Sequence, residues 1–106
     1  MLNQNLYKEY VELQVLDALS KNKTQTSISQ DLSMAIGKIN FIAQALAQKG
    51  YIKIGNFINE KDKTKYKYLL TDKGLEQKIA VTKKFIKIKK AEYERMQEEL
   101  KKYESK

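Results

Sequence analysis

The sequence of 106 residues contains no cysteine, no histidine, no proline and no tryptophan. The absence of cysteine excludes disulfides, thiolate metal sites, cysteine nucleophiles and thiol redox sensing. The absence of histidine removes the commonest general base and the commonest metal ligand. The carboxylates, lysines, tyrosines and serines that remain show no spacing typical of a catalytic cluster. We therefore expect no enzymatic activity, no catalytic residue, no metal site and no cofactor.

Long apolar runs are also missing. The chain has no stretch of about 18 consecutive apolar residues, which a membrane span would need. Residues 1–5 show no basic stretch followed by an apolar run, the pattern of a signal peptide. With 42% apolar and 32% charged residues, the composition is typical of a globular chain. We expect one compact protein in the cytoplasm.

Basic residues are in excess, and the excess is unevenly distributed. The chain has 21 lysine and arginine residues against 13 acidic residues, a net charge of +8. Residues 1–91 carry 17 basic and 8 acidic side chains, a net of +9, whereas residues 92–106 carry 4 and 5, a net of −1. A basic body indicates a polyanionic partner, usually nucleic acid. The alternative is that the lysines only aid solubility.

Hydrophobic periodicity predicts three helices, a β-hairpin and a long final helix. Thr24 and Thr71 are candidate N-caps because a threonine hydroxyl can accept a hydrogen bond from an unpaired helix amide. Gly50 is the expected C-terminal stop of the third helix. The predicted helices cover residues 3–20, 25–32, 35–49 and 72–104, and the predicted strands cover 51–57 and 65–70.

This order of elements is that of a winged helix-turn-helix. The fold class is therefore mainly α with a small β-hairpin, and a long C-terminal coiled-coil helix is added. We expect residues 1–74 to form the winged domain and residues 75–106 to form a dimerisation helix continuous with it.

Residues 25–40 fit the spacing of a helix-turn-helix. Two helices that cross steeply through a short turn need a small residue at their contact, and Ser29 meets this need. Ser33 and Met34 would form the turn, with Met34 packing inward. The apolar face of the following helix is predicted to hold it against the core. That face consists of Ile36, Ile39, Ile42, Ala43 and Leu46.

The opposite face of the third helix has side chains suited to reading DNA. A helix of this width fits the major groove, where asparagine and glutamine, here Asn40 and Gln44, pair with adenine. Lys38 can reach guanine or a phosphate, and Gly37 allows a close backbone approach. The alternative is an ordinary solvated face of a three-helix core. The candidate DNA-contacting residues are Thr24, Gln25, Ala35, Gly37, Lys38, Asn40, Phe41, Gln44, Lys61, Lys63 and Lys65.

Three of these candidates, Lys61, Lys63 and Lys65, lie at or beside the predicted hairpin tip, residues 59–64. A basic hairpin next to a recognition helix can follow the phosphates and lie over the minor groove. The alternative is a charged loop that prevents pairing of the sheet edge.

The last helix carries apolar residues at alternating intervals of four and three, the repeat of a coiled-coil seam. The seam positions run from Leu75 to Tyr103 and include Thr82 and Lys89. A second apolar stripe, Val81, Phe85 and Ile88, exists only in the first half. We expect a homodimer in which the two helices run either way; the alternative is a helix folded back onto its own domain. The candidate dimerisation residues are Leu75, Ile79, Ile86, Tyr93, Met96, Leu100 and Tyr103.

Several motifs resemble one bacterial family. Leu70-Thr71-Asp72-Lys73-Gly74 is similar to the Leu-Thr-x-Lys-Gly signature that follows the wing in MarR-type transcriptional regulators. Gly37-Lys38-Ile39-Asn40, Lys49-Gly50-Tyr51-Ile52-Lys53 and Ala91-Glu92-Tyr93-Glu94-Arg95 resemble the short, exopolysaccharide-associated subgroup. The resemblance covers about residues 10–100. Ser33 and Ala35 stand where the family frequently has glycine and serine.

The resemblance implies a dimeric winged-helix protein that binds double-stranded DNA and regulates transcription, with polysaccharide genes as candidate targets. It does not imply a small-molecule effector pocket, because the chain is shorter than a standard family member. The alternative function is a winged-helix adaptor that binds another protein through its long helix and does not bind DNA.

Overall fold

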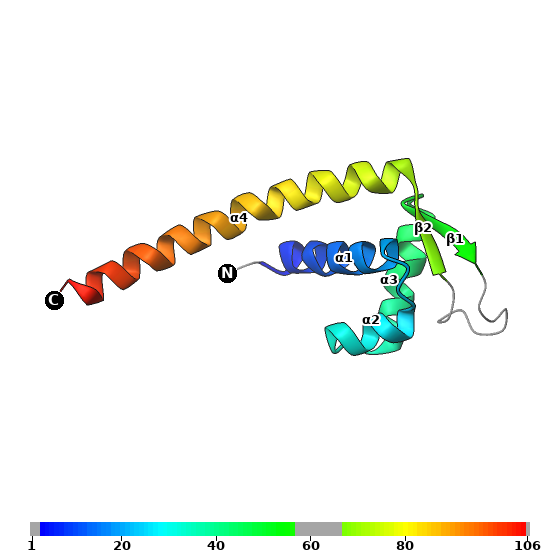
Figure 1. Ribbon diagram of the computed structural model, residues 1–106, viewed down its shortest axis with the longest axis horizontal. Coiled ribbons are helices and arrows are strands. Elements are labelled where there is room, and N and C mark those ends of the chain that lie inside the picture. The colour runs from blue at the N-terminus through cyan, green and yellow to red at the C-terminus, as the bar shows by residue number, and fades with distance from the viewer. Residues whose placement is uncertain (1–2, 57–66, 106) are drawn as a thin grey trace.

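The computed structural model describes residues 3–56 and 67–105. Figure 1 shows a small domain from which one long helix extends well beyond the other elements. The molecule measures 63 × 27 × 22 Å along its principal axes. The described elements, in chain order, are α1 (Gln4–Ser20), α2 (Gln25–Leu32), α3 (Ile36–Gln48), β1 (Ile52–Asn56), β2 (Lys67–Leu70) and α4 (Asp72–Glu104). This is the winged helix-turn-helix order expected from the sequence.

Side-chain caps fix where three of the helices begin. Asn3 accepts a hydrogen bond from the backbone amide of Leu6 at 2.8 Å and so precedes α1 rather than starting it. Thr24 caps α2 and Thr71 caps α4, as predicted. Ala35 occupies the N-cap position of α3 and makes no side-chain hydrogen bond there. A cap satisfies amides that the helix itself leaves unpaired, which explains the sharp boundaries of α1, α2 and α4.

The turn between α2 and α3 depends on one residue in an unusual conformation. Ser33 has φ 53° and ψ 44°, which is the left-handed region. Glycine adopts this region freely, whereas L-residues other than asparagine and aspartate rarely do. This conformation allows the amide of Met34 to donate to the carbonyl of Ser29 at 3.1 Å. The Ser29 hydroxyl donates to the carbonyl of Met34, so both residues close the turn. Met34 also packs against the core, as predicted.

The core lies where α1, α2, α3 and the hairpin meet. Side chains from all of them are removed from water, and this burial is the main source of stability in a chain of this length. Ile36 differs from the prediction: it is 38% exposed, because it begins α3 at the edge of the domain. The buried core residues are Val11, Val15, Leu16, Leu19, Ile28, Ile39, Ile42, Ala43, Leu46, Ile52 and Tyr68.

The helix α3 ends in a glycine turn that leads directly into the wing. Gly50 has φ +79°, and the amides of Gly50 and Tyr51 donate to the carbonyls of Ala47 and Leu46, both at 3.0 Å. This pair of bonds is the Schellman motif, which requires the left-handed conformation that glycine adopts freely. The antiparallel strands β1 and β2 then pair Ile52 with Leu70, with an irregularity before Asn56. The predicted hairpin tip, residues 59–64, lies outside the described residues.

The start of α4 is attached to the end of α3 by backbone contacts. The Thr71 amide donates to the carbonyl of Tyr51 at 3.0 Å, and the Thr71 hydroxyl donates to the carbonyl of Gly50 at 2.6 Å. At Gly74, a Cβ atom would overlap the Tyr51 carbonyl oxygen, so no larger residue fits there. These contacts give a physical reason for the Thr-x-Lys-Gly spacing. They fix the direction of α4 relative to α3.

Candidate nucleic-acid interface

The outward face of α3 is built by the register of its buried face. Ile39, Ala43 and Leu46 are at most 3% exposed and hold the helix against the core. Because a helix turns about 100° per residue, the opposite side presents Gly37, Gln44 and residues near them. The exposed residues of this face are Gly37, Lys38, Phe41, Gln44, Ala47 and Gln48, and Asn40 lies at its border, partly buried.

Two grooves lie along the flanks of this face. The groove on the wing side, about 320 Å³, lies between α3 and the hairpin and is lined by Asn40, Gln44 and Gln48 together with Ile54 and Tyr68. The groove on the other side, about 480 Å³, lies between α3 and α1 and is mainly apolar. Lys38 and Phe41 line this second groove together with Tyr7, Lys8, Val11, Glu12, Ile42, Ala45 and Lys49. The amide side chains and the lysine of α3 are therefore on opposite flanks.

The charge of this face is positive or neutral. The helix α3 contains Lys38 and no acidic residue. The nearest acidic side chain that lines a groove, Glu12, faces Lys49 at 3.9 Å. Lys53 on β1 is also exposed. An anionic ligand that approaches α3 thus meets no unpaired carboxylate along the helix.

Gln25 is a correction to the predicted interface. Its side chain is fully buried, and its Nε2 donates to the Tyr68 hydroxyl at 3.2 Å. Its Oε1 has no hydrogen-bond partner among the described residues. Gln25 therefore connects α2 to strand β2 inside the domain, and we remove it from the DNA-contacting set. A polar residue directly after an N-cap is usually exposed, so nothing in the sequence indicated that Gln25 is buried.

The other predicted contacts divide into three groups. Thr24 is partly buried and is occupied as the cap of α2. Ala35 is exposed at the start of α3, and a Cβ added at Gly37 would meet no atom within 4 Å. Gln48 was missed by the sequence analysis, although it lies four residues beyond Gln44 on the same face. Lys61, Lys63 and Lys65 lie outside the described residues.

The helix α4 presents two different faces. In its first half, Val81 and Phe85 are 7% and 3% exposed, and the Phe85 ring lies 5.1 Å from that of Tyr10 on α1. This is the second apolar stripe noted in the sequence. Lys89 also turns toward α1, with its ammonium 5.0 Å from the centre of the Tyr10 ring. The seven predicted dimerisation residues are 46–72% exposed, and α1 does not cover them.

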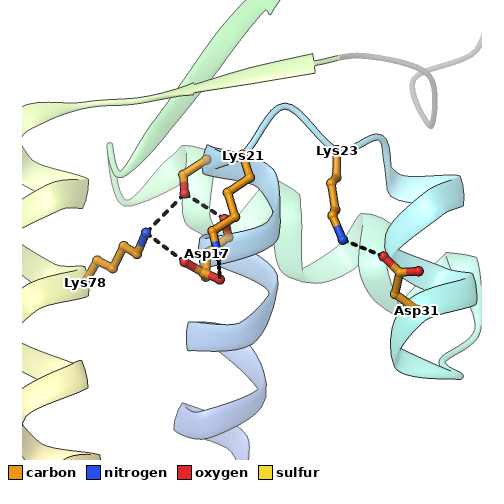
Figure 2. Close-up of polar contacts among 6 residues, drawn as sticks. Asp17, Lys21, Lys23, Asp31 and Lys78 are labelled. Atoms are coloured by element: carbon orange, nitrogen blue, oxygen red, sulfur yellow. Dashed lines mark hydrogen bonds and ion pairs between the residues drawn. The ribbon is translucent and has the colours of Figure 1, made fainter.

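Ion pairs also connect α1 and α4. Figure 2 shows Asp17 between Lys21 and Lys78, with nitrogen–oxygen distances of 2.9 and 2.7 Å. Burial acts to raise the pKa of Asp17, but hydrogen bonds and attraction from the two lysines outweigh it, so the pKa lies below its ordinary value. Lys84 pairs with Glu9 at 2.7 Å farther along. The first half of α4 is thus fixed to the domain.

Residues 3–56 and 67–105 contain no helix long and apolar enough for a membrane span. Within these same residues, no group of three or more candidate side chains could hold a metal ion.

Together, the elements define a winged helix-turn-helix protein with an extended C-terminal helix. No protein-family model and no curated protein matches the sequence. Solved structures of MarR-family regulators share the fold. A Staphylococcus aureus MarR in complex with salicylate and kanamycin has a TM-score of 0.68 at 19% identity, over 87% of this chain and 64% of that one. The chain thus spans slightly less than two thirds of that regulator.

Two further structures illustrate the same likeness. A complex of S. aureus MepR with DNA has a TM-score of 0.62 at 22% identity, covering 92% of this chain and 75% of that chain. The MarR family regulator NMB1585 from Neisseria meningitidis has a TM-score of 0.61 at 23% identity, covering 87% and 61%. At these identities the likeness establishes the fold.

Proposed function

We propose that this protein is a homodimeric, sequence-specific double-stranded DNA-binding protein that regulates bacterial transcription. The observation that carries the proposal is the outward face of α3, which combines three exposed or half-exposed amides, one lysine and no acidic residue beside a wing. A helix with such a face fits the major groove. That a protein of the same fold, MepR, has been solved with DNA is consistent with this role.

The residues on this face have different roles in the proposed DNA complex. Gln44 and Asn40 carry the paired donor and acceptor that read adenine, and Lys38 contacts a phosphate. Gly37 lets the backbone approach closely, Phe41 offers an apolar contact for a thymine methyl group, and Ala35 borders the same surface. Thr24 lies at the start of α2, where a phosphate would approach. Lys61, Lys63 and Lys65 would follow the neighbouring phosphates.

The seam of α4 is the dimer interface in this proposal. Its seven apolar side chains form an exposed stripe along the helix that is interrupted at Thr82 and Lys89, and such a stripe in water indicates an interaction surface. In this proposal residues 1–74 bind DNA and residues 75–106 dimerise. A second copy of the chain presents the same stripe, so the two domains can address two half-sites of one duplex. The protein would act in the cytoplasm, where bacterial DNA is found.

The test is DNA selection followed by titration. Duplexes selected from a random pool should bind with an affinity that falls steeply with salt, because each neutralised phosphate adds about −0.9 to the log–log slope. Gln44→Ala should lower the preference for the selected site by about 1–3 kcal/mol. Lys38→Ala should weaken all duplexes alike and make the slope shallower by about 0.9.

Gln4→Ala is the matched control, because it removes an exposed amide of α1 that lines neither groove beside α3. It should leave both affinity and preference unchanged. Binding without salt dependence, or equal effects of Gln44→Ala and Lys38→Ala on preference, would contradict the proposed roles. The motifs shared with the exopolysaccharide-associated regulators make polysaccharide genes the first natural operators to test.

One observation favours a second candidate function, a winged-helix adaptor for another protein. Phe41 and Tyr7 are 70% and 58% exposed and line the same apolar groove of about 480 Å³. Exposed aromatic residues are common in protein interfaces. Specific capture of a partner protein, together with no selection of any duplex, would favour the adaptor.

A further inference from the structure

The seam of α4 is an extended apolar surface whose side chains are exposed within the described residues. In the first half of the helix, α1 packs on a neighbouring face through Val81 and Phe85 and reaches the seam only at Lys89, whose ammonium lies over the Tyr10 ring. The apolar side chains of the seam stay exposed. In the second half the helix stands clear of the other elements (Figure 1). A second copy of α4 is the one occupant that matches its length and its heptad spacing. The seam side chains with large exposed fractions are Leu75, Ile79, Ile86, Tyr93, Met96, Leu100 and Tyr103.

Charge is distributed very unequally along α4. Residues 72–90 carry seven lysines and two acidic residues, a net of +5. Residues 91–104 carry three basic and five acidic residues, a net of −2. If two copies ran parallel, each basic half would face the other basic half. If they ran antiparallel, each basic half would face an acidic half, which attracts it.

The positions that flank the seam make the same distinction. In a parallel pair, a flanking residue faces the one five positions later in the partner. Lys78 would then face the partner's Lys83, and Glu99 would face the partner's Glu104. In an antiparallel pair centred near residue 91, Lys78 approaches the partner's Glu99 in addition to Asp17 of its own chain, and Lys83 approaches the partner's Glu104. Like charges meet in the first arrangement and opposite charges in the second.

We infer that two copies of α4 pair antiparallel along the seam. This inference rests on the proposed homodimer and specifies the relative direction of its two α4 helices. Each C-terminal half lies over the basic first half of the partner helix. The two winged domains then stand at opposite ends of the paired helices. The N-terminal ends of the two copies of α4 are then about 57 Å apart, from about 38 residues at a rise of about 1.5 Å per residue.

Spin-label distances test the direction, and the absence of cysteine from the native sequence means that each label site is unique. Lys102→Cys places a nitroxide near the C-terminal end, and Ala91→Cys places one near the centre of the pair. Antiparallel pairing puts the two labels at position 102 about 35–40 Å apart, from about 22 residues of rise, and those at position 91 within about 25 Å.

The other possible results contradict the inference. Short distances at both positions would mean parallel helices and would leave the homodimer intact. Light scattering that gives a monomer at the labelling concentration would overturn the dimer of the proposed function itself. DNA binding measured on the same samples keeps the two failures distinguishable.

Reversing the charge of one residue beside the seam should change the dimer dissociation constant in opposite senses for antiparallel and parallel pairing. Glu99→Lys brings a lysine toward the partner's Lys78 in the antiparallel pair, so the dimer dissociation constant should rise about three- to tenfold at low salt. In a parallel pair the same change would face the partner's Glu104 and lower the constant. Glu98→Lys is the matched control, because position 98 faces away from the seam; it should change the constant less than about twofold. A lowered constant for Glu99→Lys would refute antiparallel pairing.

Discussion

Replacement of Gln25 tests whether this side chain supports the domain or reads DNA. It is fully buried, bonds to Tyr68 at 3.2 Å through Nε2 and leaves Oε1 unpaired. Gln25→Leu removes one hydrogen bond, which is worth about 1 kcal/mol, and also removes the unpaired oxygen, whose burial costs a similar amount. The leucine fills most of the same volume. We therefore expect the free energy of unfolding of the leucine variant to lie within about 1 kcal/mol of that of the native protein.

Gln25→Ala makes the same polar changes but also leaves a cavity. Removing that volume from a tightly packed site should make the alanine variant about 2–3 kcal/mol less stable than the leucine variant. For a chain of this length, the difference corresponds to a Tm gap of roughly 10–20 °C. Thermal unfolding followed by circular dichroism measures it, with all variants at one protein concentration because dimerisation shifts Tm.

The DNA titration completes this test. Because the Gln25 side chain has no exposed surface, both folded variants should bind the selected duplex with nearly native affinity at a temperature below their transitions. If Gln25 instead contacted a base, the two variants would lose the same 1–3 kcal/mol or so of binding and would differ little in Tm. That result would refute its assignment to the interior.

Three other substitutions probe the turn, the helix junction and the α1–α4 ion pair. Ser33→Gly should raise stability by about 0.5–1 kcal/mol in urea unfolding, because glycine adopts the left-handed conformation without steric cost; a decrease would show that the serine side chain matters more than the strain. Gly74→Ala should cost more than about 3 kcal/mol or prevent folding, because its Cβ would overlap the Tyr51 carbonyl. The lowered pKa of Asp17 means that its ion pair stabilises the fold above the unfolded pKa of about 3.9 and is lost as the pH falls through the folded value. Native protein should therefore exceed Asp17→Asn in stability by about 0.5–1 kcal/mol at pH 7, and this difference should shrink in urea titrations below about pH 4; a constant difference would contradict the linkage.

The elements of the fold were largely predictable because each depends on local signals. The change of hydrophobic period after Gly50 separates helix from strand, and the caps at Thr24 and Thr71 set helix starts that the structure confirms. The outward face of α3 followed in the same way, since fixing Ile39 and Leu46 as buried leaves Gln44 outside.

What the sequence could not reveal depends on contacts between distant residues. Gln25 and Tyr68 are 43 positions apart, and nothing local indicates that their side chains meet inside the domain. Ile36 fits the apolar period of α3, yet it lies at an edge where nothing covers it. The Lys-Gly pair after the wing is visible as a motif, but its physical reason, the close approach of Gly74 to Tyr51, is not.

The junction between the wing and α4 connects the two roles proposed for this chain, dimerisation through α4 and DNA binding through α3. Thr71 donates hydrogen bonds to the carbonyls of Gly50 and Tyr51, so the start of α4 is held against the turn that ends α3. Farther along, Asp17 and Phe85 fix the first half of α4 against α1, which leaves little freedom between the helix and the domain. The direction of α4 therefore determines the direction of α3. In a dimer joined through α4, the spacing of the two α3 helices would be set by the paired seam rather than by the DNA, and the seam would select operators by the separation of their half-sites.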